Sequence, residues 1–164
     1  MTASRRTGLT LLVVFFAWPG AAGADNKLPA AAQAILDKAE QLELYSLEPM
    51  PGQEKAPDGF HGWKVLGKTE VKQADTRKKI LSALNRGIAE NTGKVAACFR
   101  PRHGIRASHE GKSVDLVICF ECYSLRVYVG DQEGTVLVTD SPAPTLNAVL
   151  REAKVPLPPP PERR

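Results

Sequence analysis

The chain has 164 residues, of which 43% are hydrophobic and 24% are charged, and its formal net charge is +4. Residues 1–24 carry Arg5 and Arg6 and no acidic residue, so the net charge falls from +4 to +2 without them. A charge this close to balance argues against nucleic acid as a partner, because nucleic-acid-binding proteins usually carry a strong basic excess. Without its two ends the chain keeps about 110 residues, which allows one domain with a modest core.

Residues 1–24 are predicted to be an export signal. Arg5 and Arg6 form a basic start, residues 9–17 an apolar centre, and residues 22–24 (Ala-Gly-Ala) a cleavage site. The apolar run is about half the ~20 residues that cross a bilayer, so we expect no membrane span after cleavage. The arginine pair also fits a twin-arginine signal, which leaves the general secretory and twin-arginine routes both open. We therefore expect a periplasmic or extracellular protein.

Residues 25–47 are predicted to form an N-terminal helix, because Ile35, Leu36 and Leu42 recur at helical spacing. Residues 48–62 are rich in proline and glycine, which interrupt helices and strands. They predict a linker that separates this helix from the main domain.

Residues 63–155 are predicted to form a single α+β domain. Its fold class is a strand, a helix, a three-strand antiparallel meander and a final helix, preceded by the N-terminal helix, with the helices on one sheet face. The expected elements are a strand at 63–71, a helix at 75–93, strands at 104–109, 114–129 and 135–139, and a helix from 141. Residues 156–164 are predicted to be a proline-rich disordered tail, for which a docking role stays open.

The turn at Gly111-Lys112 sets the register of the first hairpin in this meander. If the residues that flank this turn pair, Ile105 faces Ile118 on an apolar face that the helices can cover. On the other face, Arg102 faces Glu121 as a cross-strand charge pair. The register therefore predicts which side chains point toward the helices.

The predicted strand at 114–129 does not keep one alternation of apolar residues. Its apolar residues occupy even positions up to Phe120 and odd positions from Tyr123 onward. One extra residue in a strand resets which side faces the core, so a β-bulge is predicted between these two residues. Across such a bulge, Cys119 and Cys122 both point to the sheet face opposite the helices.

All three cysteines of the chain, Cys98, Cys119 and Cys122, lie in or beside the predicted meander. An oxidising compartment favours a disulfide, and we expect it between Cys98 and Cys122, because Cys122 lies nearer to Cys98 across the strands. The alternative is a zinc or iron site made of Cys98, Cys119, Cys122 and His103, although the register places His103 on the helix-facing side. Dithiol redox chemistry is disfavoured, because an apolar strand beside Glu121 gives a thiolate no support.

Arg100, Arg102 and Arg106 alternate along one predicted sheet face and, with His103, form a candidate ligand or anion site. Guanidinium groups bind carboxylates and phosphates through paired hydrogen bonds. The alternative is a solvated face on which Arg102 pairs with Glu121. The sequence places no serine or carboxylate to form a triad with His103, so no catalytic residue is predicted.

The runs that begin at Cys98 (CFRPRHGI) and at Asp115 (DLVICFEC) resemble a pattern shared by a family of uncharacterised exported bacterial proteins. The resemblance covers residues 60–130, approximately, and implies export and a shared small domain. It implies no activity, cofactor or catalytic residue. We expect an exported, non-enzymatic binding or structural module, stabilised by a disulfide, with no cofactor and with a protein or small molecule as its partner. The alternative function is a cysteine-ligated metal-binding protein.

Overall fold

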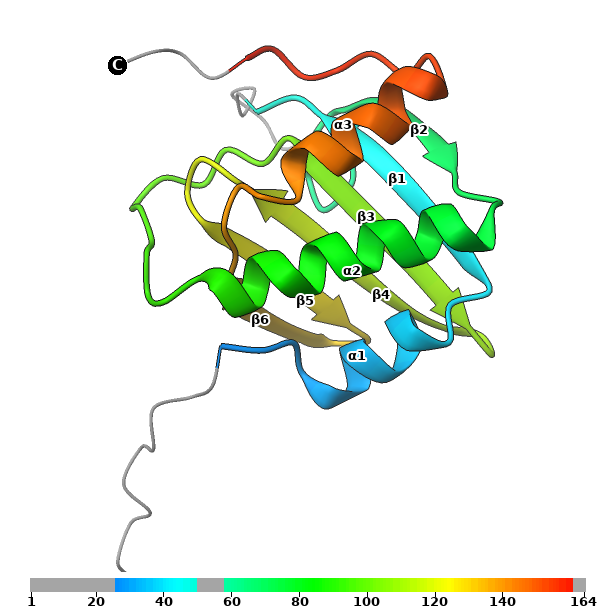
Figure 1. Cartoon of the computed structure of the whole chain (residues 1–164), viewed down its shortest axis with the longest axis horizontal. Helices are drawn as coiled ribbons and strands as arrows, with labels where there is room; N and C mark the ends of the chain where they lie inside the picture. Colours follow the sequence, from blue (N-terminus) through cyan, green and yellow to red (C-terminus); the bar gives the residue numbers. More distant parts are fainter. Residues whose placement is uncertain (1–25, 50–57, 161–164) are drawn as a thin grey trace, which may run out of the picture.

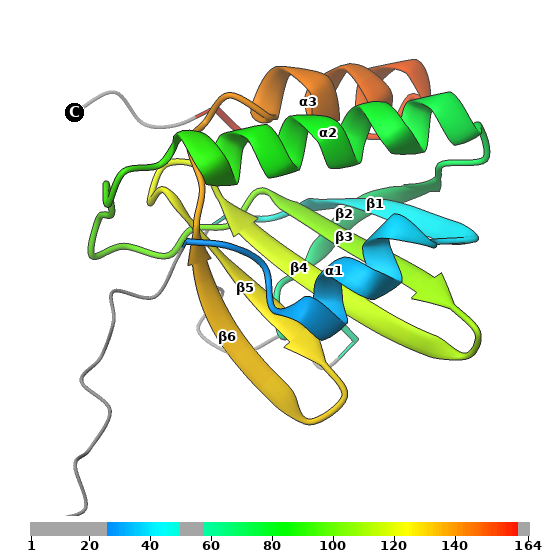
Figure 2. The same ribbon diagram turned by 60° about the horizontal axis from the view of Figure 1, so that its bottom comes forward.

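The computed structural model describes residues 26–49 and 58–160, which form a six-stranded sheet and three helices (Figure 1). The helices all lie on one side of the sheet (Figure 2). The predicted α+β class, with a helix before the first strand, is confirmed. In chain order the elements are α1 (Ala30–Asp37), β1 (Gln41–Leu47), β2 (Val65–Glu70), α2 (Ala74–Glu90), β3 (His103–His109), β4 (Lys112–Cys119), β5 (Ser124–Val129), β6 (Gln132–Leu137) and α3 (Ala143–Glu152).

Parts of three predicted segments fall outside the described residues. They are the export signal at 1–24, residues 50–57 of the linker and residues 161–164 of the tail. Within the described ranges, no helix has the length and the apolar character that crossing a membrane requires.

The strands lie in the order β2-β1-β3-β4-β5-β6, and each neighbouring pair is antiparallel. The last four strands follow one another in the chain and form a meander. β1 pairs with β2 on one side and with β3 on the other, while β2 and β6 form the edges. β1 and β3 are therefore neighbours in the sheet, although β2 and α2 lie between them in the sequence.

The main core lies between the sheet and the helices. Successive side chains of a strand point to opposite faces, so one face of the sheet presents a row of apolar side chains to the helix layer. Apolar residues at helical spacing on α2 and α3 cover this row. The fully buried members include Leu42, Leu44, Ile80, Leu84, Ile105, Leu116, Ile118, Leu125, Leu146 and Leu150.

The face of the sheet that points away from the helices, here called the outer face, carries a second and smaller core. Tyr45 and Val117 on the strands pack there with Phe60, which comes from residues 58–64, here called the outer-face loop. The ring of Phe60 stacks on that of Tyr45, with centroids 4.3 Å apart. The outer-face loop therefore lies across the sheet rather than away from it.

The prediction of a helix across residues 25–47 is correct only for α1, because residues 41–47 form β1. Leu42 fits the helical spacing that begins at Ile35, but it also fits a strand in which Leu42 and Leu44 face the core. Hydrogen bonding to β2 and β3 decides between the two patterns. Because β1 lies inside the sheet, this segment belongs to the same domain as residues 63–155 and is not separated from it by a linker.

The predicted β-bulge between Phe120 and Tyr123 is wrong, because the chain reverses direction there. Cys119 pairs with Ser124 across four turn residues, so the predicted strand 114–129 is two strands, β4 and β5. Tyr123 completes the turn with a φ of 54°. A reversal of this length places the even apolar positions of β4 and the odd ones of β5 on the same face.

The β3–β4 hairpin is shifted by two residues from its predicted register. Its turn is Glu110-Gly111, whose φ values of 48° and 73° are typical of the two-residue turn that matches strand twist. Ile105 therefore pairs with Leu116 rather than Ile118. A shift by two residues changes the partners but leaves each side chain on its predicted face.

The start of the predicted disordered tail is packed against the domain. Val155 and Leu157 lie against the main core. A Cβ atom on Gly67 of β2 would lie 2.9 Å from Val155 Cγ1, so the chain passes over this strand where glycine leaves room. Residues 155–160, here called the C-terminal segment, thus form part of the domain surface.

Gly104 of β3 provides a test of the outer-face packing. A Cβ at this position would lie 2.7 Å from two ring carbons of Phe60 and 3.3 Å from Tyr45 Cβ. We expect Gly104→Ala to displace the Phe60 ring and to lower the free energy of unfolding by about 2 kcal/mol. Urea unfolding measures this loss.

Gly134→Ala in β6 is the matched control, because nothing lies within 4 Å of its added Cβ. This control should cost less than about 0.5 kcal/mol, as open surface positions do. Equal stabilities of the two variants would contradict the described packing of Phe60 on Gly104.

Candidate functional site

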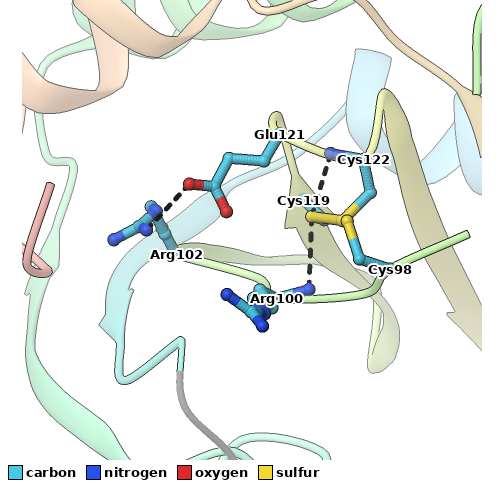
Figure 3. Close-up of a disulfide and its surroundings, with 6 residues drawn as sticks. All are labelled: Cys98, Arg100, Arg102, Cys119, Glu121 and Cys122. Carbon is cyan, nitrogen blue, oxygen red and sulfur yellow. Dashed lines mark hydrogen bonds and ion pairs between the residues drawn. A yellow bond between two sulfur atoms is a disulfide. The ribbon is translucent and has the colours of Figure 1, made fainter. Parts of the chain in front are cut away.

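Three cysteine sulfurs meet where β4 ends (Figure 3). Cys119 is the last residue of β4, and a disulfide joins it to Cys122 in the β4–β5 turn. The free thiol of Cys98 lies 2.8 Å from Cys122 Sγ. Cys119 and Cys122 are buried, whereas Cys98, in the α2–β3 connection (residues 91–102), is only half-buried.

Backbone hydrogen bonds hold this sulfur cluster in place. Cys119 Sγ accepts from the N–H of Arg100 at 3.3 Å and from the N–H of Cys122 at 3.2 Å (Figure 3). The N–H of Ala96 donates to the Cys122 carbonyl at 3.1 Å. The α2–β3 connection is therefore tied to the β4–β5 turn on both sides of Cys98.

The predicted disulfide between Cys98 and Cys122 differs from the one in the structure, which joins Cys119 to Cys122. The tight β4–β5 turn explains the difference, because it brings the Cα atoms of the bonded pair within 5.3 Å. The alternative metal set also needs His103, whose Nε2 instead binds Asn147 on α3. Across residues 26–49 and 58–160, no group of three or more His, Cys, Asp or Glu residues could hold a metal ion.

A groove with a volume of 690 Å³ lies between α3, the β4–β5 turn and the C-terminal segment. Apolar side chains form much of its wall: Phe120, Tyr123, Ala143, Pro144 and Leu157, with prolines 158 to 160. Its polar residues are Arg102, His103, Glu121, Asp140, Asn147 and Arg151. The groove thus combines an apolar wall with a few polar groups, as small-molecule sites do.

Arg102 is the most buried cation of this groove. Its Nη2 donates to Glu121 Oε1 at 2.9 Å, so the predicted pairing of these two residues is confirmed. The Arg102 side chain is 13% exposed, yet its Nε and Nη1 atoms are buried without a hydrogen-bond partner. Buried donors are costly when they lack an acceptor, so these atoms favour the binding of an acceptor group.

His103 is a buried, neutral neighbour of Arg102. Burial lowers the pKa of His103 to about 4, because desolvation disfavours the imidazolium ion, and the charge of Arg102 acts in the same direction. The hydrogen bond between His103 Nε2 and Asn147 Oδ1, at 2.8 Å, offsets only part of this effect. At neutral pH His103 therefore adds no charge to the groove.

A third polar group, here called the outer-face cluster, consists of His61, Arg106 and Asp115. Arg106 donates to both carboxylate oxygens of Asp115, at 2.8 and 2.6 Å, and His61 Nε2 lies 2.7 Å from the same carboxylate. The His61 ring stacks on Tyr128 with centroids 3.8 Å apart. The cluster therefore ties the outer-face loop to β3 and β4.

The residues of the predicted anion site lie in three separate places: the groove, the outer-face cluster and the sulfur cluster. Arg102 and His103 line the groove, while Arg106 binds Asp115 on the outer face. Arg100 contributes its backbone N–H to the sulfur cluster. The cause is that β3 begins only at His103, so Arg100 and Arg102 lie in the α2–β3 connection, where the regular alternation of faces does not apply.

Sequence reasoning missed His61 and Asn147 altogether. His61 lies in the segment predicted to be a linker, and Asn147 lies on a helix that meets β3 only in the folded domain. The correct hairpin turn would have placed Arg106 opposite Asp115 and so found most of the outer-face cluster.

The fold and the site define an antiparallel α+β domain with a mixed polar and apolar groove and a separate sulfur cluster. Comparison of the chain with protein-family models, curated proteins and solved structures finds no match.

Proposed function

We propose that this protein is an exported, non-enzymatic binding module whose groove holds a small molecule with an apolar body and a carboxylate. The observation that carries the proposal is Arg102, which lines the groove and whose Nε and Nη1 atoms are buried without a hydrogen-bond partner. Hydrogen bonds from a guanidinium to a carboxylate are among the strongest in proteins. Export is supported by the signal-like pattern of residues 1–24.

The shape and charge of the groove narrow the ligand class. A volume of 690 Å³ fits a molecule of modest size, and its apolar wall suits a hydrocarbon or aromatic body. Arg151 adds a second cation, while Glu121 and Asp140 are the acidic residues of the lining. Because Glu121 already pairs with Arg102, it competes with a ligand carboxylate for the same guanidinium.

The experiment compares phenylacetate with phenylacetamide, which has nearly the same shape and no charge. Titrations followed by NMR should shift the signals of Phe120, Tyr123 and Asn147, with the carboxylate bound at least about ten-fold more tightly. Arg102→Gln should remove this preference. Arg151→Gln, which changes an exposed arginine of the same groove, should keep most of it.

Two further results separate this proposal from non-specific binding. Glu121→Gln removes the competing carboxylate and should strengthen phenylacetate binding. Shifts confined to the 600 Å³ groove between α1 and the β3–β4 hairpin would contradict the proposal. Equal affinities for the acid and the amide would contradict it as well.

A further inference from the structure

We propose that Cys98, Cys119 and Cys122 form a thiol–disulfide exchange site in which Cys122 is shared between two alternative disulfides. The free Cys98 sulfur lies 2.8 Å from Cys122 Sγ, which is closer than two unlinked sulfur atoms normally rest. Exchange in proteins proceeds by attack of a thiolate on one sulfur of a disulfide. The exchange itself requires no ligand in the groove.

The exchange step conserves atoms and electrons. Cys98 gives its proton to water, and its thiolate forms a bond with Cys122 Sγ. The bond between Cys119 and Cys122 breaks at the same time, and its electron pair leaves on Cys119 Sγ, which takes up one proton in place of the one that Cys98 released. One disulfide and one thiol are present before and after, so the step needs neither an oxidant nor a reductant.

The surroundings of Cys119 suit it to the role of leaving group. Its Sγ accepts two backbone N–H groups, from Arg100 at 3.3 Å and from Cys122 at 3.2 Å. Hydrogen bonds from N–H donors stabilise negative charge on sulfur as they do on oxygen. The structure thus supplies the support for a thiolate that the sequence alone did not indicate.

The backbone near the cluster is held whichever pair is bonded. The backbone N–H of Ala96 donates to the Cys122 carbonyl at 3.1 Å, and the backbone N–H of Arg102 donates to the Ile118 carbonyl at 3.1 Å. The Lys94 ammonium also lies 3.9 Å from the centre of the Tyr123 ring. These contacts keep the α2–β3 connection beside the β4–β5 turn, so exchange needs side-chain rotation and no rearrangement of strands.

Exchange changes which thiol solvent can reach. With Cys119 and Cys122 linked, the free thiol is that of half-buried Cys98. After exchange it is that of Cys119, whose exposed fraction is 0%. The site therefore exposes or hides a reactive thiol without any change in the oxidation state of the protein.

The first test maps disulfides in the purified mature protein and in three variants. Samples are quenched in acid, digested with pepsin at low pH and analysed by mass spectrometry. Wild-type protein should yield both linked pairs, Cys98 with Cys122 and Cys119 with Cys122. Cys119→Ser should form the first pair and Cys98→Ser the second, whereas Cys122→Ser should form neither.

A single linkage in wild-type protein at every pH from 6 to 9 would overturn the proposal. The proposal would also be overturned if Cys119→Ser kept two free thiols under conditions in which Cys98→Ser forms its disulfide. Circular dichroism of each variant confirms that it is folded, and the wild-type result does not depend on the variants.

The second test measures exchange in the wild-type protein alone. Excess maleimide reacts with the half-buried Cys98 thiol. Molecules in which Cys98 is bonded to Cys122 can react only after exchange has released Cys98. The slow phase of labelling should become independent of maleimide concentration, and its rate should rise about ten-fold per pH unit while the attacking thiol is mostly protonated. A single phase proportional to maleimide at all concentrations, together with one mapped linkage, would contradict exchange.

Discussion

The wild-type protein is expected to lose about 3 kcal/mol of unfolding free energy between pH 7.5 and pH 4 through one buried imidazole. Burial holds the pKa of His103 at about 4 in the folded protein, against an ordinary value of 6.5. Between these two values the unfolded chain binds the proton and the folded chain does not. The stabilisation is therefore complete above pH 6.5 and is lost as the pH falls toward 4.

Urea unfolding at a series of pH values measures this loss, and variants separate His103 from the carboxylates that titrate in the same range. The glutamine of His103→Gln stays neutral at every pH. Between pH 7.5 and pH 4, this variant should therefore lose about 3 kcal/mol less unfolding free energy than the wild type. His109→Gln is the control, because His109 ends the same strand and its side chain, 20% exposed, lies beside Glu40. If His103→Gln and the wild type shared one pH dependence, the buried-imidazole account would be wrong.

Asp115→Asn is expected to lower the free energy of unfolding by about 2 to 3 kcal/mol. The carboxylate of Asp115 is 9% exposed and accepts two hydrogen bonds from Arg106, which raise the pKa of that guanidinium. It also binds His61 of the outer-face loop. An amide cannot accept all of these bonds, so the loop should loosen and proteolysis near residues 58–64 should become faster.

Glu133→Gln is the matched control for this substitution. Glu133 is also on the outer face, but its side chain is 54% exposed and lies 3.9 Å from Arg126. Exposed pairs of this kind contribute less than about 1 kcal/mol. A double-mutant cycle of Asp115→Asn with Arg106→Gln should be strongly non-additive, and additive losses would show that the described pair contributes no coupling.

The sequence predicted the α+β class and the gathering of the cysteines, because both depend on short-range patterns. The alternation around Ile105 and Leu116 survives an error of two residues in register, since such an error leaves every side chain on its face. The predicted contact between Arg102 and Glu121 is also present, although Glu121 lies in the β4–β5 turn and not at a paired strand position. Local periodicity was sufficient for these features.

The features that sequence reasoning missed depend on contacts between distant parts of the chain. Leu42 fits both a helix and a strand, and only pairing with β2 and β3 makes it part of β1. The groove forms only where α3 and the C-terminal segment pack beside the β4–β5 turn, and no local sequence pattern predicts this packing. The same holds for His61, which reaches Asp115 across 54 residues of sequence.

The short span of the Cys119–Cys122 disulfide limits how far it restricts the unfolded chain. Its cysteines are three residues apart in sequence, and a ring this small stabilises by about 2 kcal/mol in the chain-entropy model. A bond between Cys98 and Cys122, at a separation of 24, would contribute about 3.5 kcal/mol. The same covalent bond in a different place therefore removes a different amount of freedom from the unfolded ensemble. Its position, and not only its presence, sets the resistance of the protein to unfolding.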